Sequence, residues 1–132
     1  MEKLTVQSND RTTIIDITHQ IQALVQENGI KNGICYVFIP HTTAGVTINE
    51  NADPDVKSDM LMEINKVIPF TDSYRHIEGN SAAHIKATLF GNSEMIIINN
   101  GRLQLGTWQG VFICEFDGPR TRKVSVKFIN SE

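Results

Sequence analysis

The sequence predicts an α+β fold: one compact domain over residues 1–132, with two to three helices and a large, mainly antiparallel β-sheet. Short apolar runs rich in β-branched residues dominate the chain, which is typical of strands. Most of these runs are joined by short turns that contain Gly, Asn or Pro, and only a few segments have helical periodicity. A chain of 132 residues is long enough for one hydrophobic core and too short for two.

The N-terminal third of the chain begins with two alternating runs, residues 3–8 and 12–18, which predict an antiparallel hairpin. Thr18 then offers a helix cap, and the helix is expected to end at Asn28-Gly29. The apolar run over residues 33–40 predicts a buried strand that Pro40 ends, and residues 45–50 resume the strand pattern.

A second helix is predicted to begin at Asp53-Pro54, because an acidic cap favours the positive end of the helix dipole. Residues 71–80 form a polar loop, and residues 81–91 predict a short helix that ends at Gly91. The second helix is expected to turn one apolar stripe toward the core: Val56, Met60, Ile64, Val67 and Ile68. The remaining runs predict strands over residues 94–99, 102–106, 110–117 and 122–130.

Composition and charge indicate which partners, location and cysteine chemistry to expect. The net charge of −3 and pI near 5.8 give no reason to expect a nucleic acid or an anionic membrane as partner. The basic run over residues 118–127 is offset by the acidic residues just before it, so a solvated strand edge is expected there. With no signal peptide pattern and no long apolar segment, a cytoplasmic protein is expected. Cys35 and Cys114 lie in apolar runs without CxxC spacing and are predicted to be buried thiols.

Polar groups gather in "FIPHTTAGVTINENADPDV", residues 38–56, directly behind an apolar run. Turn chemistry accounts for many of these residue types, and an active site is the alternative. His76 and His84 have His-x7-His spacing, and together with His41 they are compatible with a three-histidine metal site that leaves positions open for substrate. Histidines that only hydrogen-bond or face solvent fit the same pattern. Four nearby carboxylates are candidates for metal ligand, for a group that orients one, or for general base: Glu50, Asp53, Asp55 and Glu78.

The segment from Asn99 to Arg120 is the second informative one. Its glycines match neither GxGxxG nor GxxxxGK[ST], which excludes the common nucleotide-binding motifs. Thr107, Trp108 and Gln109 lie between two predicted strands and could present a hydroxyl, an aromatic face and an amide to a ligand. A tryptophan in a β-rich chain also serves as a core anchor.

Three long blocks, "PHTTAGVTINENADPDV", "YRHIEGNSAAHIKATLFG" and "GRLQLGTWQGVFICEFDGPR", resemble the YjbQ family of small proteins, which is associated with a secondary thiamine-phosphate synthase activity. The resemblance covers almost the whole chain. It implies a compact α+β subunit, a homotrimer, and shared polar residues gathered in a pocket that can hold a metal ion. The residues that match the family's blocks are His41, Thr42, Asn49, Glu50, His76, Glu78, His84, Gly106, Thr107, Trp108 and Gln109.

The activity that this resemblance implies joins hydroxymethylpyrimidine diphosphate to thiazole phosphate and releases pyrophosphate. The substrate is then a small phosphorylated molecule, and the expected cofactor is a divalent metal ion, zinc or magnesium. On this interpretation the metal ligands are His41, His76 and His84, the catalytic residues are Thr42, Asn49, Glu50 and Glu78, and the substrate-binding residues are Arg102, Thr107, Trp108, Gln109 and Arg120. A departing diphosphate also demands positive charge, for which the candidates are Arg75, Lys86, Arg102 and Arg120.

Two alternatives stay open. Three histidines suit zinc, whereas magnesium-diphosphate chemistry prefers oxygen ligands. A different metal-dependent reaction is therefore possible, such as hydrolysis of a small molecule by a metal-bound hydroxide with Glu50 or Glu78 as base. The other alternative is a non-catalytic trimer that binds a small ligand. A trimer is also expected because so many apolar strands in a small chain would otherwise leave strand edges or apolar surface uncovered.

Overall fold

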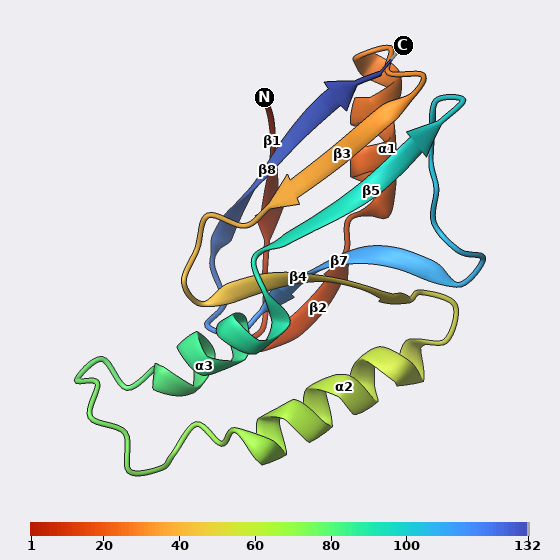
Figure 1. Cartoon of the computed structure of the whole chain (residues 1–132). Helices are drawn as coiled ribbons and strands as arrows, with labels where there is room; N and C mark the ends of the chain where they lie inside the picture. Colours follow the sequence, from red (N-terminus) through yellow and green to blue (C-terminus); the bar gives the residue numbers. More distant parts are fainter. Residues whose placement is uncertain (132) are drawn as a thin grey trace.

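The computed structural model describes residues 1–131, which form three helices and eight strands (Figure 1). The α+β class is therefore confirmed. In chain order the elements are β1 (Glu2–Gln7), β2 (Thr13–Asp16), α1 (Thr18–Glu27), β3 (Gly33–Phe38), β4 (Ala44–Glu50), α2 (Pro54–Val67), α3 (Ser81–Phe90), β5 (Ser93–Asn99), β6 (Arg102–Leu103), β7 (Gln109–Glu115) and β8 (Thr121–Asn130).

The strands form two antiparallel sheets. The larger has five strands in the order β1-β8-β3-β5-β6, and the smaller has three in the order β2-β7-β4. The predicted hairpin of the first two strands is wrong, because Leu4 of β1 lies opposite Val124 of β8 while Ile14 of β2 lies opposite Cys114 of β7. An alternating pattern is satisfied by any neighbouring strand, so it predicts a strand without naming its partner.

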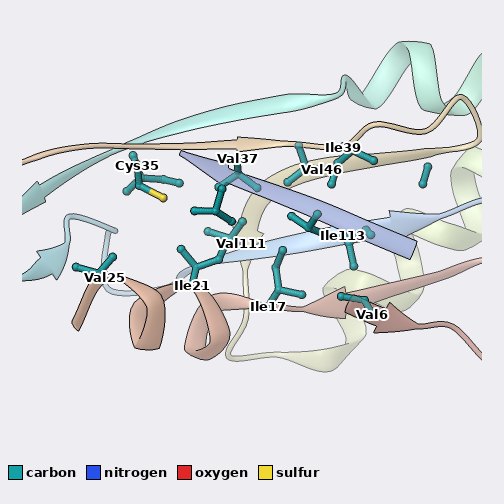
Figure 2. Packing of buried hydrophobic residues seen from close by; sticks show 14 of the residues in the cluster. Val6, Ile17, Ile21, Val25, Cys35, Val37, Ile39, Val46, Val111 and Ile113 are labelled. Atoms are coloured by element: carbon teal, nitrogen blue, oxygen red, sulfur yellow. The ribbon is translucent and has the colours of Figure 1, made fainter. Parts of the chain in front are cut away.

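The main core lies between the two sheets and α1 (Figure 2). Helix α1 contributes Ile21 and Val25, which are fully buried against Val37 of β3 and Val111 of β7 in the same cluster. The helix ends at Asn28 as predicted, and Gly29 follows with a positive φ of 64°. The apolar side chains of this core hold the two sheets and α1 together. The opposite face of the small sheet is covered by α2 and α3.

Helices α2 and α3 cover the outer face of the small sheet, where Phe112 and Cys114 of β7 contact Ala83 and Ala87 of α3. Strand β7 is therefore covered on both faces, which explains why its sequence is continuously apolar instead of alternating. Helix α2 packs more loosely than its apolar stripe predicted. It has no fully buried residue, and Val67 is 64% exposed, so the prediction that this residue faces the core is wrong.

Local signals set the helix ends that matter for the site. Asp53 caps α2 by accepting a hydrogen bond from Asp55 N–H at 2.9 Å, with Pro54 in the first turn, as the sequence predicted. Asn80 occupies the N-cap position of α3, and the helix ends at Gly91, which has a φ of 90°. This places the N-terminus of α3 directly after the polar loop that carries His76.

The basic run near the C-terminus is not a solvated edge throughout. Arg122 is 2% exposed and points inward, on the same side of β8 as Val124 and Val126, so that prediction is wrong for this residue. The two cysteines are free and buried, as predicted, and burial raises the pKa of each thiol to about 12. No helix within residues 1–131 is long and apolar enough to cross a membrane.

Candidate functional site

Three segments that are distant in sequence meet at one end of the small sheet, where β4 begins and β7 ends. They are the loop before β4, the loop and first turns of α3, and the loop between β7 and β8. Together they line a hollow of about 270 Å³, which we call the histidine pocket. Its lining residues are Thr42, Thr43, His76, Glu78, Asn80, His84, Asp117 and Arg120.

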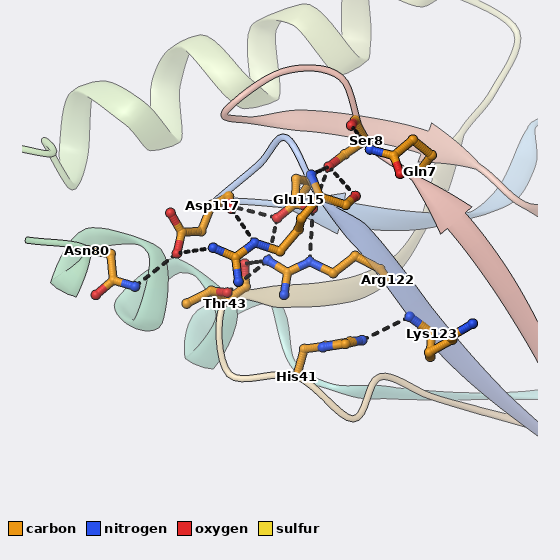
Figure 3. Close-up of polar contacts among 10 residues, drawn as sticks. Gln7, Ser8, His41, Thr43, Asn80, Glu115, Asp117, Arg122 and Lys123 are labelled. Atoms are coloured by element: carbon orange, nitrogen blue, oxygen red, sulfur yellow. Dashed lines mark hydrogen bonds and ion pairs between the residues drawn. The ribbon is translucent and has the colours of Figure 1, made fainter. Parts of the chain in front are cut away.

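A buried ion pair between Arg122 and Glu115 lies beneath this pocket (Figure 3). Arg122 also donates to both the carbonyl oxygen and the hydroxyl of Thr43, at 3.1 and 2.8 Å. Glu115 in turn accepts from Ser8 Oγ at 2.7 Å and from Asp117 N–H at 3.0 Å. The pair thus fixes two of the segments that form the pocket, the one at Thr43 and the one at Asp117.

The pKa of Glu115 reflects these contacts. Burial by itself would raise this pKa, but the hydrogen bonds from Arg122, Asp117 N–H and Ser8, together with the charge of Arg122, hold it below its ordinary value of 4.5. The carboxylate is therefore ionised at neutral pH and keeps Arg122 in place. At the rim, Asp117 binds Arg120 at 3.2 Å and accepts from Asn80 Nδ2 at 2.9 Å.

The rings of His76 and His84 lie edge to face in the histidine pocket, with centroids 5.4 Å apart and an interplanar angle of 89°. His84 also lines three neighbouring hollows. One of these, of about 350 Å³, contains Arg75 as well. The side-chain oxygen of Asn80, Oδ1, is buried without a hydrogen-bond partner among the described residues. Polar side chains therefore gather around His76 and His84.

His41 lies next to the histidine pocket and not in it. It lines a separate hollow of about 300 Å³, the His41 pocket, together with Thr42, Ala44, His84, Ala87, Thr88 and Asn92. Its Nε2 atom accepts a hydrogen bond from Lys123 N–H at 2.9 Å (Figure 3). Burial lowers the pKa of His41, and the charge of Arg122 lowers it further, so the ring is neutral at neutral pH.

These positions do not fit the predicted three-histidine metal site. Within residues 1–131 no group of three or more His, Cys, Asp or Glu side chains could hold a metal ion. Moreover, one nitrogen of His41 already accepts a backbone N–H. A ligating histidine instead donates from its second nitrogen to an acceptor. The metal site remains a prediction that the donor arrangement in one chain does not support.

The remaining candidate residues of the matching blocks lie at the opposite end of β4. Asn49 pairs with Gly110 and Glu50 with Gln109, and the carbonyl of Trp108 accepts from Asn51 N–H at 2.9 Å. Strand β4 has seven residues, so this end lies roughly 20 Å from the histidine pocket. Thr107 and Trp108 are exposed there, whereas Gln109 is engaged by Gly106 N–H at 2.8 Å. One chain does not bring Glu50 or Trp108 to the histidines.

The four cations considered for a diphosphate are also divided. Arg120 lines the histidine pocket and Arg75 the adjoining hollow. Arg102 lies on β6, outside every hollow that involves a histidine. Lys86 is fully buried, donates to Asn65 Oδ1 at 2.7 Å and lies 3.7 Å from the ring centroid of Phe70. Lys86 therefore packs α3 onto α2 and is remote from solvent.

Sequence reasoning missed five residues that shape the site: Thr43, Asn80 and Asp117 as lining groups, and Glu115 and Arg122 as their support. A signal for Arg122 was present in the alternation of β8, since it shares a face with Val124 and Val126. Glu115 has no such signal, because only the folded chain places it beside Arg122.

Residues 2–131 match the family model described as UPF0047 protein YjbQ-like. This chain belongs to the YjbQ family. It is 51% identical to the UPF0047 protein YugU of Bacillus subtilis over 98% of both chains. It is 48% identical to a UPF0047 protein of Methanocaldococcus jannaschii over 98% of this chain and 94% of that one.

Solved structures of YjbQ relatives have the same fold. The crystal structure of an uncharacterised conserved YjbQ/UPF0047 protein from Clostridium acetobutylicum superposes with a TM-score of 0.96 at 53% identity, covering 98% of this chain and 100% of that one. A conserved hypothetical protein from Thermus thermophilus gives 0.91 at 39% identity, covering 98% and 100%. These relatives establish the YjbQ family and fold, and the question of the reaction rests on the site.

Proposed function

We propose that the histidine pocket binds a small phosphorylated compound and that the protein has thiamine-phosphate synthase activity. The observation that carries the proposal is the convergence of Thr42, His76, His84 and Arg120 from three segments onto one hollow. These side chains provide hydrogen-bond donors and the positive charge of Arg120, which is what a phosphoryl group needs. The carboxylates of Glu78 and Asp117 line the same pocket, and Asp117 pairs with Arg120. Arg75, in the adjoining hollow, adds a second cation near His76.

The reaction would use these groups to stabilise the leaving diphosphate. The thiazole nitrogen forms a bond to the methylene carbon of the pyrimidine while the bond from that carbon to the diphosphate oxygen breaks. The electron pair leaves on the pyrophosphate, whose growing charge Arg120 would stabilise. His76 or His84 would supply a hydrogen bond or a proton to the departing oxygen.

We also propose that the protein acts as a homotrimer with its pocket near a subunit boundary. The outer face of the five-stranded sheet supports this, because it exposes several apolar side chains, among which Tyr36 lies opposite Met95 and Ile34 lies opposite both Ile97 and Ile129. Surfaces of this kind are normally covered by a partner. Assembly would also be the means by which Glu50 and Trp108 of one copy reach the histidines of another.

A ligand-binding trimer without catalysis is the second candidate. It is favoured by the same apolar face and by the lack, among the described residues, of a donor group that could hold a metal ion. The metal-dependent hydrolase receives no support from this arrangement, since it needs a metal-bound hydroxide. The synthase and the ligand-binding trimer would both bind a phosphorylated ligand, and only the synthase would convert it to product.

The test is an assay of pyrophosphate release and thiamine phosphate formation from the two substrates. We expect activity in the wild type and a loss of at least about ten-fold in His84→Ala and Arg120→Ala, equal to roughly 1.4 kcal/mol of transition-state stabilisation. His19→Ala and Lys31→Ala change exposed residues outside the hollows and serve as matched controls. A raised melting temperature with either substrate but no turnover would favour the ligand-binding module. If the wild type shows neither turnover nor a raised melting temperature with substrate, the proposal is wrong.

A further inference from the structure

The hydrogen bond between His41 and Lys123 occurs where the pairing of β3 with β8 has just ended. The last pair of this ladder is Phe38 and Ser125. Two residues before Ser125 in β8, the N–H of Lys123 donates to His41 Nε2, in the loop after β3, at 2.9 Å (Figure 3). The imidazole thus takes the place of the next carbonyl oxygen of β3.

This bond determines which ring nitrogen carries the proton. To accept from Lys123 N–H, Nε2 must present a lone pair. A neutral imidazole has one N–H, so the proton lies on Nδ1. No hydrogen bond engages Nδ1 within the described chain, and this nitrogen therefore offers a free donor. A metal ligand requires the reverse, a free lone pair on the nitrogen that faces the site.

We propose that His41 uses Nδ1–H to bind an oxyanion oxygen, of a phosphoryl or carboxylate group, in the His41 pocket, and that it is not a metal ligand. This inference rests on the proposed function in assigning the same ligand class to the adjoining pocket. The two pockets share Thr42 and His84, so one phosphorylated molecule can reach both.

The lining of the His41 pocket supports an anion over a cation. None of its lining residues is a carboxylate or a thiol, and Thr42, Thr88 and Asn92 add hydroxyl and amide groups. The charges that act on His41 are those of Arg122, Arg120 and Glu115. Glu115 is neutralised by its ion pair with Arg122, and Arg120 is held at the rim by Asp117. These charges are therefore balanced in two ion pairs, and the pocket offers a ligand neutral hydrogen-bonding groups with no carboxylate or thiolate for a divalent cation.

The test is ¹H–¹⁵N spectroscopy of the histidine side chains in the intact protein, titrated with inorganic phosphate, pyrophosphate or zinc. We expect His41 as the Nδ1–H tautomer, with phosphate or pyrophosphate shifting its resonances and leaving those of exposed His19 unchanged. Zinc at one equivalent should not move the His41 signals. An Nε2–H tautomer, or coordination of zinc by His41, would overturn the inference, as would the absence of any shift with both anions.

Variants extend the test without depending on activity. His41→Ala should weaken pyrophosphate binding at least ten-fold by calorimetry, whereas His19→Ala should not change it. If His41→Ala does not fold, the spectra of the wild type still decide. Anion binding at His41 without thiamine phosphate formation would leave this inference standing and reject the proposed reaction. Turnover without any effect of anions on His41 would reject the inference alone.

Discussion

Gly45 of β4 and Gly91 at the end of α3 meet backbone to backbone. Val46 N–H donates to Gly91 O at 3.0 Å, and a Cβ atom on Gly45 would lie 2.7 Å from that same oxygen. Only glycine allows this approach at position 45. The contact fixes the end of α3 against the strand that follows Thr42, and so it sets how His84 is placed relative to the loop before β4.

Replacing Gly45 by alanine should push α3 away from β4. We expect a loss of stability of about 1–3 kcal/mol, typical of overpacking, together with weaker ligand binding at the histidine pocket. Urea unfolding and pyrophosphate calorimetry measure the two effects. Gly106→Ala is a suitable control for stability, because its Cβ would meet first the flexible Gln109 side chain, at 3.3 Å. Equal stability losses in both variants would contradict the role assigned to the Gly45 contact.

The buried ion pair predicts a large cost for removing one partner. Arg122→Ala leaves the charge of Glu115 buried and Thr43 without two donated hydrogen bonds, and it should lower the free energy of unfolding by about 3–5 kcal/mol. Denaturant unfolding measures this. The double variant Arg122→Met with Glu115→Leu should recover much of the loss, since it leaves no unpaired charge. A cost below about 1 kcal/mol, as for an exposed pair, would show that the pair is solvated.

Glu115 also predicts a dependence of stability on acid pH. Its pKa in the folded protein lies below the ordinary value of 4.5, so the unfolded chain binds more protons as the pH falls past that value. The stability that Glu115 contributes is complete above 4.5 and is lost as the pH falls through the folded pKa. Glu115→Gln should be less stable at neutral pH, and its stability should lack the part that the wild type loses on acidification. Parallel pH profiles of unfolding for the two proteins would contradict the prediction.

Lys86 predicts a dependence of stability on alkaline pH. Burial, aided by the charge of Arg11, lowers its pKa from 10.5 to about 8, so the folded protein binds fewer protons than the unfolded chain between these values. Stability should therefore rise as the pH increases from about 8 to 10.5, by an amount on the order of 3 kcal/mol. Lys86→Met should lack this rise. Denaturant unfolding across this range measures it, and identical slopes in both proteins would disprove it.

The exposed apolar side chains on the outer face of the five-stranded sheet predict that the protein assembles as a homotrimer. Light scattering at micromolar concentration should give about three times the chain mass of 14.8 kDa. Ile97→Asp places a charge among these side chains and should shift the mass toward that of a single chain, because a buried unpaired charge is costly. Ser58→Asp on exposed α2 is the control. A wild-type mass near that of one chain would refute the trimer.

The sequence by itself determined the type of most elements and several of their ends. Thr18 is an exception, since it is the first residue of α1 and not its cap, and β6 is another, since it covers only Arg102–Leu103 of the predicted residues 102–106. Local signals such as Asp53-Pro54, Asn28-Gly29 and Gly91 act within a few residues, so they are readable without the fold. The same holds for the strand runs and for His84, which the histidine spacing and the family resemblance singled out. The predicted elements needed only short-range chemistry, namely caps, breakers and periodicity, whereas the choice of His84 also rested on the family resemblance.

Only the tertiary structure decided which strands pair and which polar residues meet. Alternation is the same for any partner, so it could not show that β1 and β2 enter different sheets. Nor could spacing show that Glu50 lies a strand's length from His84, or that Glu115 lies against Arg122. The proton position on His41 depends on a backbone N–H that is 82 residues away in sequence. Such relationships arise from long-range packing, which no local pattern encodes.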